Sequence, residues 1–114
     1  MAANNLQMDI RKLGDGVSVI DINGEITASS EDQITEAHGK AGEGAQAVIL
    51  NFEGLEYMNS GGIGLLVTTL IRAQRAGHDL RAYGLSDHYR EIFSLTRLDE
   101  AISLYDDEEA AVAG

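Results

Sequence analysis

The 114-residue chain is predicted to fold as one α/β domain, in which a mixed sheet of about five strands is flanked by helices. Two observations predict this class. The chain begins with two alternating apolar segments joined by a glycine turn, a pattern typical of an antiparallel hairpin. It continues with strand-like and helix-like segments in turn, which is typical of parallel strands joined by crossover helices. The expected order is ββαβαβαβα, within a single domain over residues 1–114.

The hairpin is expected to comprise residues 7–13 and 17–22, because apolar and polar side chains alternate in both segments. Gly14-Asp15-Gly16 lies between them and is typical of a tight turn, since both glycines can adopt positive φ angles. Gly24 is expected to end the second strand. These signals predict that the first two strands are antiparallel neighbours.

The first helix is predicted to begin at Ser29, which together with Asp32 forms a pattern similar to a capping box. Glycines at 39, 42 and 44 mark its end. Its apolar side is thin, so we expect it at the surface, with His38 as a structural residue rather than a ligand. The side chains that recur at helical spacing are Ile34, Ala37, His38 and Ala41.

The centre of the chain predicts a strand, a helix and a second parallel strand. Residues 45–52 are continuously apolar, which indicates a strand covered on both faces, and residues 53–58 are interpreted as a connection. A helix is expected over residues 63–76, with Gly77 at its C-terminal cap, followed by a strand over residues 80–83. The expected buried stripe of this helix is Ile63, Leu66, Val67, Leu70 and Ile71.

The C-terminal part predicts a helix, a short strand and a final helix. Ser86 and Asp87 are suited to cap a helix that runs to Leu95, and residues 102–105 are strand-like. The acidic residues 106–109 favour the first turn of a terminal helix, since carboxylates are stabilised at the positive end of the helix dipole. The side chains of the earlier helix that should face inward are Tyr89, Ile92 and Phe93.

Composition excludes several classes of function. The formal net charge of −11 would repel nucleic-acid phosphates and anionic lipid surfaces. The absence of cysteine excludes disulfides, thiolate zinc sites and a cysteine nucleophile. No apolar run approaches the length of a membrane span, and the N-terminus does not resemble a signal peptide, so we expect a cytoplasmic protein. We also expect neither a metal nor a cofactor.

The segment from Asn51 to Gly64, NFEGLEYMNSGGIG, places Ser60 where a strand and turn lead into a helix. Ser60 is suited to cap that helix, and replacing a serine cap typically lowers stability by about 1 kcal/mol. The glycines at 61, 62 and 64 are unusual there, since each costs up to about 1 kcal/mol relative to alanine in a helix. They indicate a bare backbone that a partner or a phosphate can approach.

Known glycine-rich motifs do not match this segment. A dinucleotide fingerprint that begins at Gly62 would need glycine at Val67, and a P-loop would need a lysine. A nucleophile elbow around Ser60 would need glycine at Met58. As a possible base, His78 is predicted about 20 Å away at the far end of the helix, whereas the spacing does not exclude His88.

The segments VILNF (48–52) and LEYMNSGGIG (55–64) resemble the signature of STAS domains, in particular that of bacterial anti-sigma factor antagonists, also called anti-anti-sigma factors. Gly24-Glu25-Ile26 is similar to a Gly-Glu-Leu segment of this family, and the resemblance covers almost the whole chain. The family signature usually reads Asp-Ser-Ser/Thr-Gly-Leu/Ile-Gly, and its first serine is phosphorylated by a serine kinase that is also an anti-sigma factor. That serine corresponds to Ser60, whereas the aspartate is Asn59 here and the second serine or threonine is Gly61.

The resemblance implies a partner-switching protein rather than an enzyme. Unmodified, it would bind an anti-sigma factor with the fold of histidine-kinase-like ATPases and free a sigma factor, and phosphorylation of Ser60 would end the binding until a phosphatase reversed it. A second reading is a STAS subunit of an ABC transporter complex for lipids, or a signalling scaffold, and a third is an esterase-like enzyme that uses Ser60. The residues expected to bind the partner are Asn59, Ser60, Gly61, Gly62, Ile63, Leu66, Ser86 and Tyr89.

Overall fold

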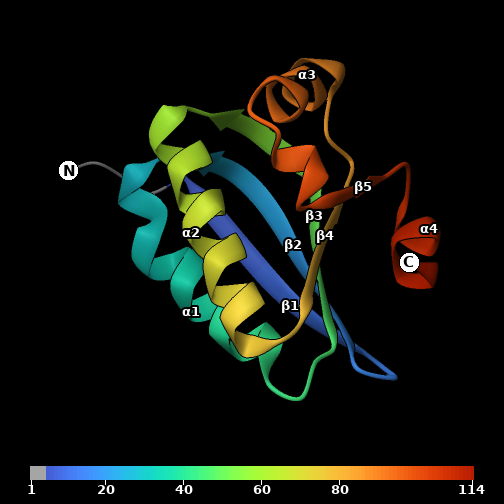
Figure 1. The fold of residues 1–114 in the computed structure, drawn as a ribbon. Helices are drawn as coiled ribbons and strands as arrows, with labels where there is room; N and C mark the ends of the chain where they lie inside the picture. Colours follow the sequence, from blue (N-terminus) through green and yellow to red (C-terminus); the bar gives the residue numbers. More distant parts are fainter. Residues whose placement is uncertain (1–4) are drawn as a thin grey trace.

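The computed structural model describes residues 5–114 and shows the predicted α/β architecture (Figure 1). A five-stranded sheet has the order β1-β2-β3-β4-β5, in which β1 is antiparallel to β2 and all later neighbours are parallel. The 3₁₀ turns are Ala28–Ser30 and Leu98–Glu100. The strands and helices, in chain order, are β1 (Leu6–Gly14), β2 (Val17–Ile26), α1 (Glu31–Gly42), β3 (Ala47–Met58), α2 (Ser60–Ala76), β4 (Asp79–Tyr83), α3 (Asp87–Leu95), β5 (Ser103–Tyr105) and α4 (Glu108–Ala113).

The helices divide between the two faces of the sheet. Helices α1 and α2 cover one face, and α4 lies on the other (Figure 1). The larger core lies under α1 and α2 and includes Phe52, whose ring forms a T-shaped contact with Phe93 from α3 at 6.2 Å between centroids. The smaller core joins Val19, Ile49 and Tyr83 to Ala111 of α4. Residues 47–52 are therefore covered on both faces, as their apolar run predicts.

The strand pair β2–β3 is longer than the sequence pattern indicates. The prediction that Gly24 ends the second strand is wrong, and so is the interpretation of residues 53–58 as a connection. The two strands stay paired as far as Ile26 and Met58 because the register shifts twice, after Asp21 and after Gly24. The extension carries several exposed side chains, so its sequence has no continuous apolar signal.

Helix α1 starts differently from the prediction, although its buried side is as expected. A 3₁₀ turn precedes it, its N-cap is Ser30 rather than Ser29, and the Ser30 hydroxyl accepts a hydrogen bond from the backbone N–H of Thr27 at 3.1 Å. The predicted apolar positions are all buried. His38 is among them and contacts His78, a pairing that the sequence pattern did not indicate.

Helix α2 is rotated relative to the predicted stripe. Val67 and Ile71 were expected to be buried, but their exposed fractions are 39% and 44%. The side that meets the sheet includes Gly62, Thr69 and Ala73, because these small residues let the helix backbone lie close to its neighbours. The Thr69 hydroxyl donates to the Leu65 carbonyl at 2.8 Å, which satisfies its polarity inside the core.

The predicted ends of the other helices agree with the structure. Gly77 ends α2 with a φ angle of 80°, as a C-terminal glycine cap requires. Ser86 caps α3, and α4 begins with acidic residues behind the N-cap Asp107. Of the inward residues predicted for α3, Phe93 is buried, while Tyr89 and Ile92 are half-buried.

Candidate functional site

The Ser60 site lies where β3 ends and α2 begins. The cap of α2 is Asn59, in extended conformation, and its side-chain oxygen accepts from the Gly62 backbone N–H at 2.9 Å. The expectation that Ser60 caps the helix is therefore corrected. Asparagine and serine serve equally well as caps, so local preference did not distinguish two adjacent candidates.

Ser60 is instead the first residue of α2, and its side chain is exposed. Among the hydrogen bonds of residues 5–114, none uses its hydroxyl. This hydroxyl lies in the first turn of a 17-residue helix, where the partial positive charge of the helix dipole favours an added anion. The position is thus accessible to a modifying enzyme and electrostatically suited to carry a phosphate.

The three glycines of the first turns have different roles. A Cβ atom on Gly61 would lie 2.9 Å from the Cβ of Ala28, and one on Gly62 would lie 2.3 Å from the carbonyl oxygen of Ile26. Nothing lies within 4 Å of the corresponding position on Gly64. The expectation that all three glycines leave backbone open to a partner is therefore corrected, because Gly62 is needed for packing against the end of β2 and Gly61 for packing against the turn that follows it.

One side of α2 continues from Ser60 as an exposed, largely apolar strip, here called the α2 stripe: Ser60, Gly64, Val67 and Ile71. Steps of four, three and four residues place these positions on the same side of a helix. Leu66 was predicted to bind the partner, but it is 1% exposed and belongs to the core. Gly62 is also buried, and Ile63 is half-buried against the core.

Tyr89 connects α3 to the end of β3. Strand β4 pairs with β3 only as far as Asn51, so the last residues of β3 lack a strand on that side. The Tyr89 hydroxyl accepts from the Met58 backbone N–H at 2.8 Å, immediately before Asn59. Ser86 accepts from the Tyr89 N–H at 3.4 Å and is exposed. The structure thus gives Tyr89 an internal role, and its contact with a partner stays a prediction.

The two histidines weighed as bases for Ser60 have other contacts. His78 lies beyond the opposite end of α2, where its Nε2 is 2.8 Å from Nε2 of His38. Burial lowers the pKa of both His38 and His78. The His88 ring forms a T-shaped contact with Tyr89 at 4.9 Å between centroids, and no hydrogen bond described for residues 5–114 joins it to Ser60. No serine–histidine pair is therefore assembled at this site.

A polar network on the opposite face of the sheet was not apparent from the sequence. Arg11 donates two hydrogen bonds to Asp21, at 2.7 and 2.9 Å, and a third to Glu108 of α4. Tyr83 also donates to Glu108, at 2.9 Å. The arginine lowers the pKa of both carboxyl groups, and burial together with Glu108 raises the pKa of Tyr83 to about 12. The network fixes α4 to the sheet and lies apart from Ser60.

The part of the chain that the structure describes holds neither a metal-binding cluster nor a membrane-spanning helix. Within residues 5–114, no three side chains of the metal-binding types lie close enough to hold one ion. No helix in the same range is both long and apolar enough to cross a bilayer.

Comparisons with known proteins agree with this architecture. The family model for the STAS domain matches residues 9–111. An anti-sigma factor antagonist from Mycobacterium paratuberculosis is 24% identical, with a TM-score of 0.75 over 99% of this chain and 97% of the other. The Bacillus cell fate determinant SpoIIAA in its phosphorylated form is 22% identical, with a TM-score of 0.71 over 94% and 98%. A sulfate transporter family protein from Wolinella succinogenes is 20% identical, with a TM-score of 0.77 over 90% and 87%. At these identities, the similarities to solved structures demonstrate a common fold.

Proposed function

This chain belongs to the STAS domain family, and we propose that it is an anti-sigma factor antagonist whose binding is switched off by phosphorylation of Ser60. The observation that carries the proposal is the position of Ser60. Its side chain is exposed in the first turn of α2, and its hydroxyl is not engaged in capping the helix, because Asn59 is the cap. Of the similar structures, one is named an anti-sigma factor antagonist and another a cell fate determinant in its phosphorylated form.

The proposed partner is an anti-sigma factor that is also a serine kinase with the fold of histidine-kinase-like ATPases. It would contact Ser60 and the rest of the α2 stripe, together with the exposed start of α3 at Ser86. Gly64 supports close approach, since its surroundings are open, and Val67 and Ile71 provide apolar area. A kinase that docks along this stripe would have the Ser60 hydroxyl within its contact surface.

Phosphorylation would act locally. A phosphate adds about −1.5 to −2 charges at pH 7, and the start of α2 favours it through the helix dipole. Buried in an interface, that charge must lose its hydration, which weakens the complex unless the partner provides a cation. The chain itself needs no rearrangement, because the Asn59 cap does not involve Ser60. A phosphatase would restore binding.

The test is incubation with a serine-kinase anti-sigma factor and Mg-ATP, followed by intact mass measurement and site mapping. We expect a gain of one phosphate that is lost in Ser60→Ala and retained in Ser94→Ala, which removes another exposed serine on α3. Unmodified protein should bind the kinase, and phosphorylated protein should bind it more weakly. Phosphate transfer that persists in Ser60→Ala would refute the assignment of the switch to Ser60.

A second candidate keeps the binding role without the switch, as a STAS subunit of an ABC lipid-transport complex or a signalling scaffold. It is favoured by the two departures from the family signature. Asn59 caps α2 through its amide oxygen, and Gly61 allows the close approach of Ala28. Both residues are therefore explained by the fold, without recognition by a kinase. Binding to a transporter ATPase without phosphate transfer from any serine kinase would support this candidate over the first.

A further inference from the structure

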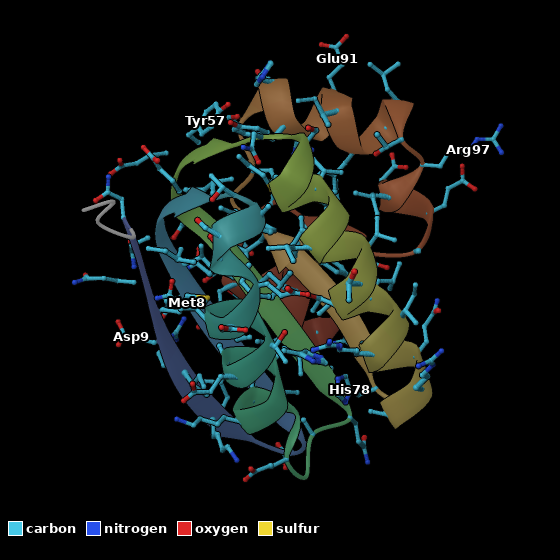
Figure 2. The ribbon with its side chains drawn as sticks, turned by 90° about the vertical axis from the view of Figure 1, so that its left-hand side faces the viewer. Met8, Asp9, Tyr57, His78, Glu91 and Arg97 are labelled. Atoms are coloured by element: carbon cyan, nitrogen blue, oxygen red, sulfur yellow. The ribbon has the colours of Figure 1, made fainter. Side chains whose placement is uncertain are left out.

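The outer edge of β1 pairs with no strand in the described part of the chain and lies beside a groove of mixed apolar and polar lining, and the Leu6 carbonyl accepts a hydrogen bond from the Gln33 side chain at 3.2 Å. In the described part of the chain, β2 is the only strand that pairs with β1. Figure 2 shows Asp9 projecting past this edge and Met8 beside α1. Between β1 and α1 lies a groove of about 230 Å³. The residues that line it are Met8, Ile10, Gln33, Glu36, Ala37 and Lys40.

Asp9 has an unfavourable position in the isolated chain. It is exposed and lies directly opposite Asp21 in the β1–β2 pair, and like charges at opposite positions destabilise a sheet. Arg11 lies two residues further on and therefore on the same face. Its side chain is bonded to Asp21 and Glu108 but remains 39% exposed. No salt bridge described for residues 5–114 includes Asp9.

We propose that β1 pairs with β1 of a second copy in an antiparallel register centred on Ile10, which joins the two sheets into one. In this register Asp9 of each copy lies opposite Arg11 of the other, and the two Ile10 residues face each other. An unpaired edge strand supports such pairing, because its free N–H and C=O groups are satisfied by an equivalent strand. The apolar side chains of Met8 and Ile10 would lie on the same side as the groove.

Charge selects this register over its neighbours. Side chains of the two copies stay on matching faces only if one residue of β1 lies directly opposite the same residue of the other copy. Each possible register is therefore centred on a single residue, and neighbouring registers differ by one residue in that centre. A register centred on residue 9 would oppose Asp9 to Asp9, and one centred on residue 11 would oppose Arg11 to Arg11. Only the centre at Ile10 forms two Asp9–Arg11 pairs, one on each side of the axis.

Sedimentation equilibrium tests whether the chain dimerises and whether Asp9 contributes. We expect a concentration-dependent dimer whose dissociation constant rises about tenfold or more in Asp9→Arg, since the substitution places two cations opposite each other at both symmetric positions. The matched control is Glu91→Arg, which makes the same charge change at an exposed position of α3. Both variants reduce the net charge of −11 by two, so general repulsion would decrease equally in each.

Disulfide crosslinking tests the register directly, because the natural chain has no cysteine. Opposite residues of antiparallel strands have Cα atoms about 4.5–5.5 Å apart, within the range that a disulfide spans. Ile10→Cys should therefore form a covalent dimer on mild oxidation much faster than the exposed control Ser94→Cys.

Three results would overturn the proposal. The first is a monomer at every concentration, and the second is crosslinking of Ile10→Cys no faster than of the control. The third is a dimer whose dissociation constant is the same with Asp9→Arg as with Glu91→Arg, which would place the interface elsewhere. The sedimentation result stands by itself if Ile10→Cys fails to fold. These outcomes are independent of phosphorylation at Ser60, so the proposed function is tested separately.

Discussion

Two glycines in the first turns of α2 should respond in opposite ways to the same substitution. A Cβ atom on Gly62 would lie 2.3 Å from the carbonyl oxygen of Ile26 and 2.8 Å from Cγ of Met58. A Cβ atom on Gly64 would meet nothing within 4 Å. The two positions are two residues apart in one helix, so each serves as the control for the other. We expect Gly62→Ala to destabilise the protein and Gly64→Ala to stabilise it.

The magnitudes follow from two opposing effects. Alanine improves helix propensity by about 0.5–1 kcal/mol at either position. At Gly62 the added methyl group cannot be accommodated by a side chain alone, since the nearest atom belongs to the backbone of β2. Forcing such an overlap typically costs about 1–3 kcal/mol. Because the overlap at 2.3 Å involves a backbone atom, we take the upper part of this range, about 2–3 kcal/mol. The expected net change in the free energy of unfolding is a loss of about 1–2.5 kcal/mol for Gly62→Ala and a gain of about 0.5–1 kcal/mol for Gly64→Ala.

Urea denaturation followed by far-UV circular dichroism measures both changes, and an unchanged slope with denaturant would show that the unfolded state is unaffected. A Gly62→Ala variant as stable as the natural protein would refute the close approach of α2 to β2. A destabilised Gly64→Ala variant would refute the open surroundings of Gly64. The same Gly64→Ala variant should weaken binding of the proposed anti-sigma factor, because its methyl group lies on the α2 stripe.

Three further predictions concern single contacts. Asn59→Ala should lower the free energy of unfolding by about 1 kcal/mol, because the α2 cap is lost. Asn59→Asp should change it by only about a few tenths of a kcal/mol, since a carboxylate also accepts a backbone hydrogen bond at a helix start. Urea denaturation measures both changes. Tyr89→Phe should lower the melting temperature, with a loss of about 1 kcal/mol, because the last N–H of β3 loses its acceptor; an unchanged melting temperature would contradict this bond. Burial lowers the pKa of His38 and His78, so the unfolded chain binds more protons than the folded chain as the pH falls. The contribution of the two histidines to stability should be full above their unfolded pKa of 6.5 and should decrease as the pH falls below it. Urea midpoints measured between about pH 7 and pH 5 test this window. Replacing both histidines by leucine should reduce the dependence of the midpoint on pH, whereas replacing the exposed His88 by glutamine should leave that dependence unchanged.

Local signals were sufficient for most elements of the fold. The alternation on either side of Gly14-Asp15-Gly16 predicted the hairpin, and Gly77 and the acidic residues 106–109 predicted where helices end and begin. These features are encoded within a few residues, because turns and caps are satisfied by nearby backbone groups. The motif around Ser60 likewise predicted that Ser60 lies where a strand leads into a helix, although β3 runs on to Met58 in place of the expected connection and α2 begins at Ser60 rather than at residue 63.

The errors arose where distant segments meet. The cap was undecided locally, because asparagine and serine cap equally well, whereas the role of Gly61 and Gly62 depends on where Ile26 and Ala28 lie against α2. The rotation of α2, which exposes Val67 and Ile71 while Leu66 is buried as the stripe predicts, depends on the same close packing. A sequence pattern shows that a helix has an apolar side but does not fix which of several adjacent apolar residues faces the sheet.

The fold class, the order of the elements and the position of Ser60 at the start of a helix could all be predicted from local sequence patterns. The length of the β2–β3 pair, the exposed α2 stripe and the contacts between residues far apart in the chain became apparent only in the folded molecule. His38 and His78 are 40 positions apart, and Arg11 and Glu108 are 97 apart. The physical reason is that turns and caps are satisfied by neighbouring groups, whereas bulged strand pairs, buried histidine pairs and close glycine contacts exist only once separate elements have packed together.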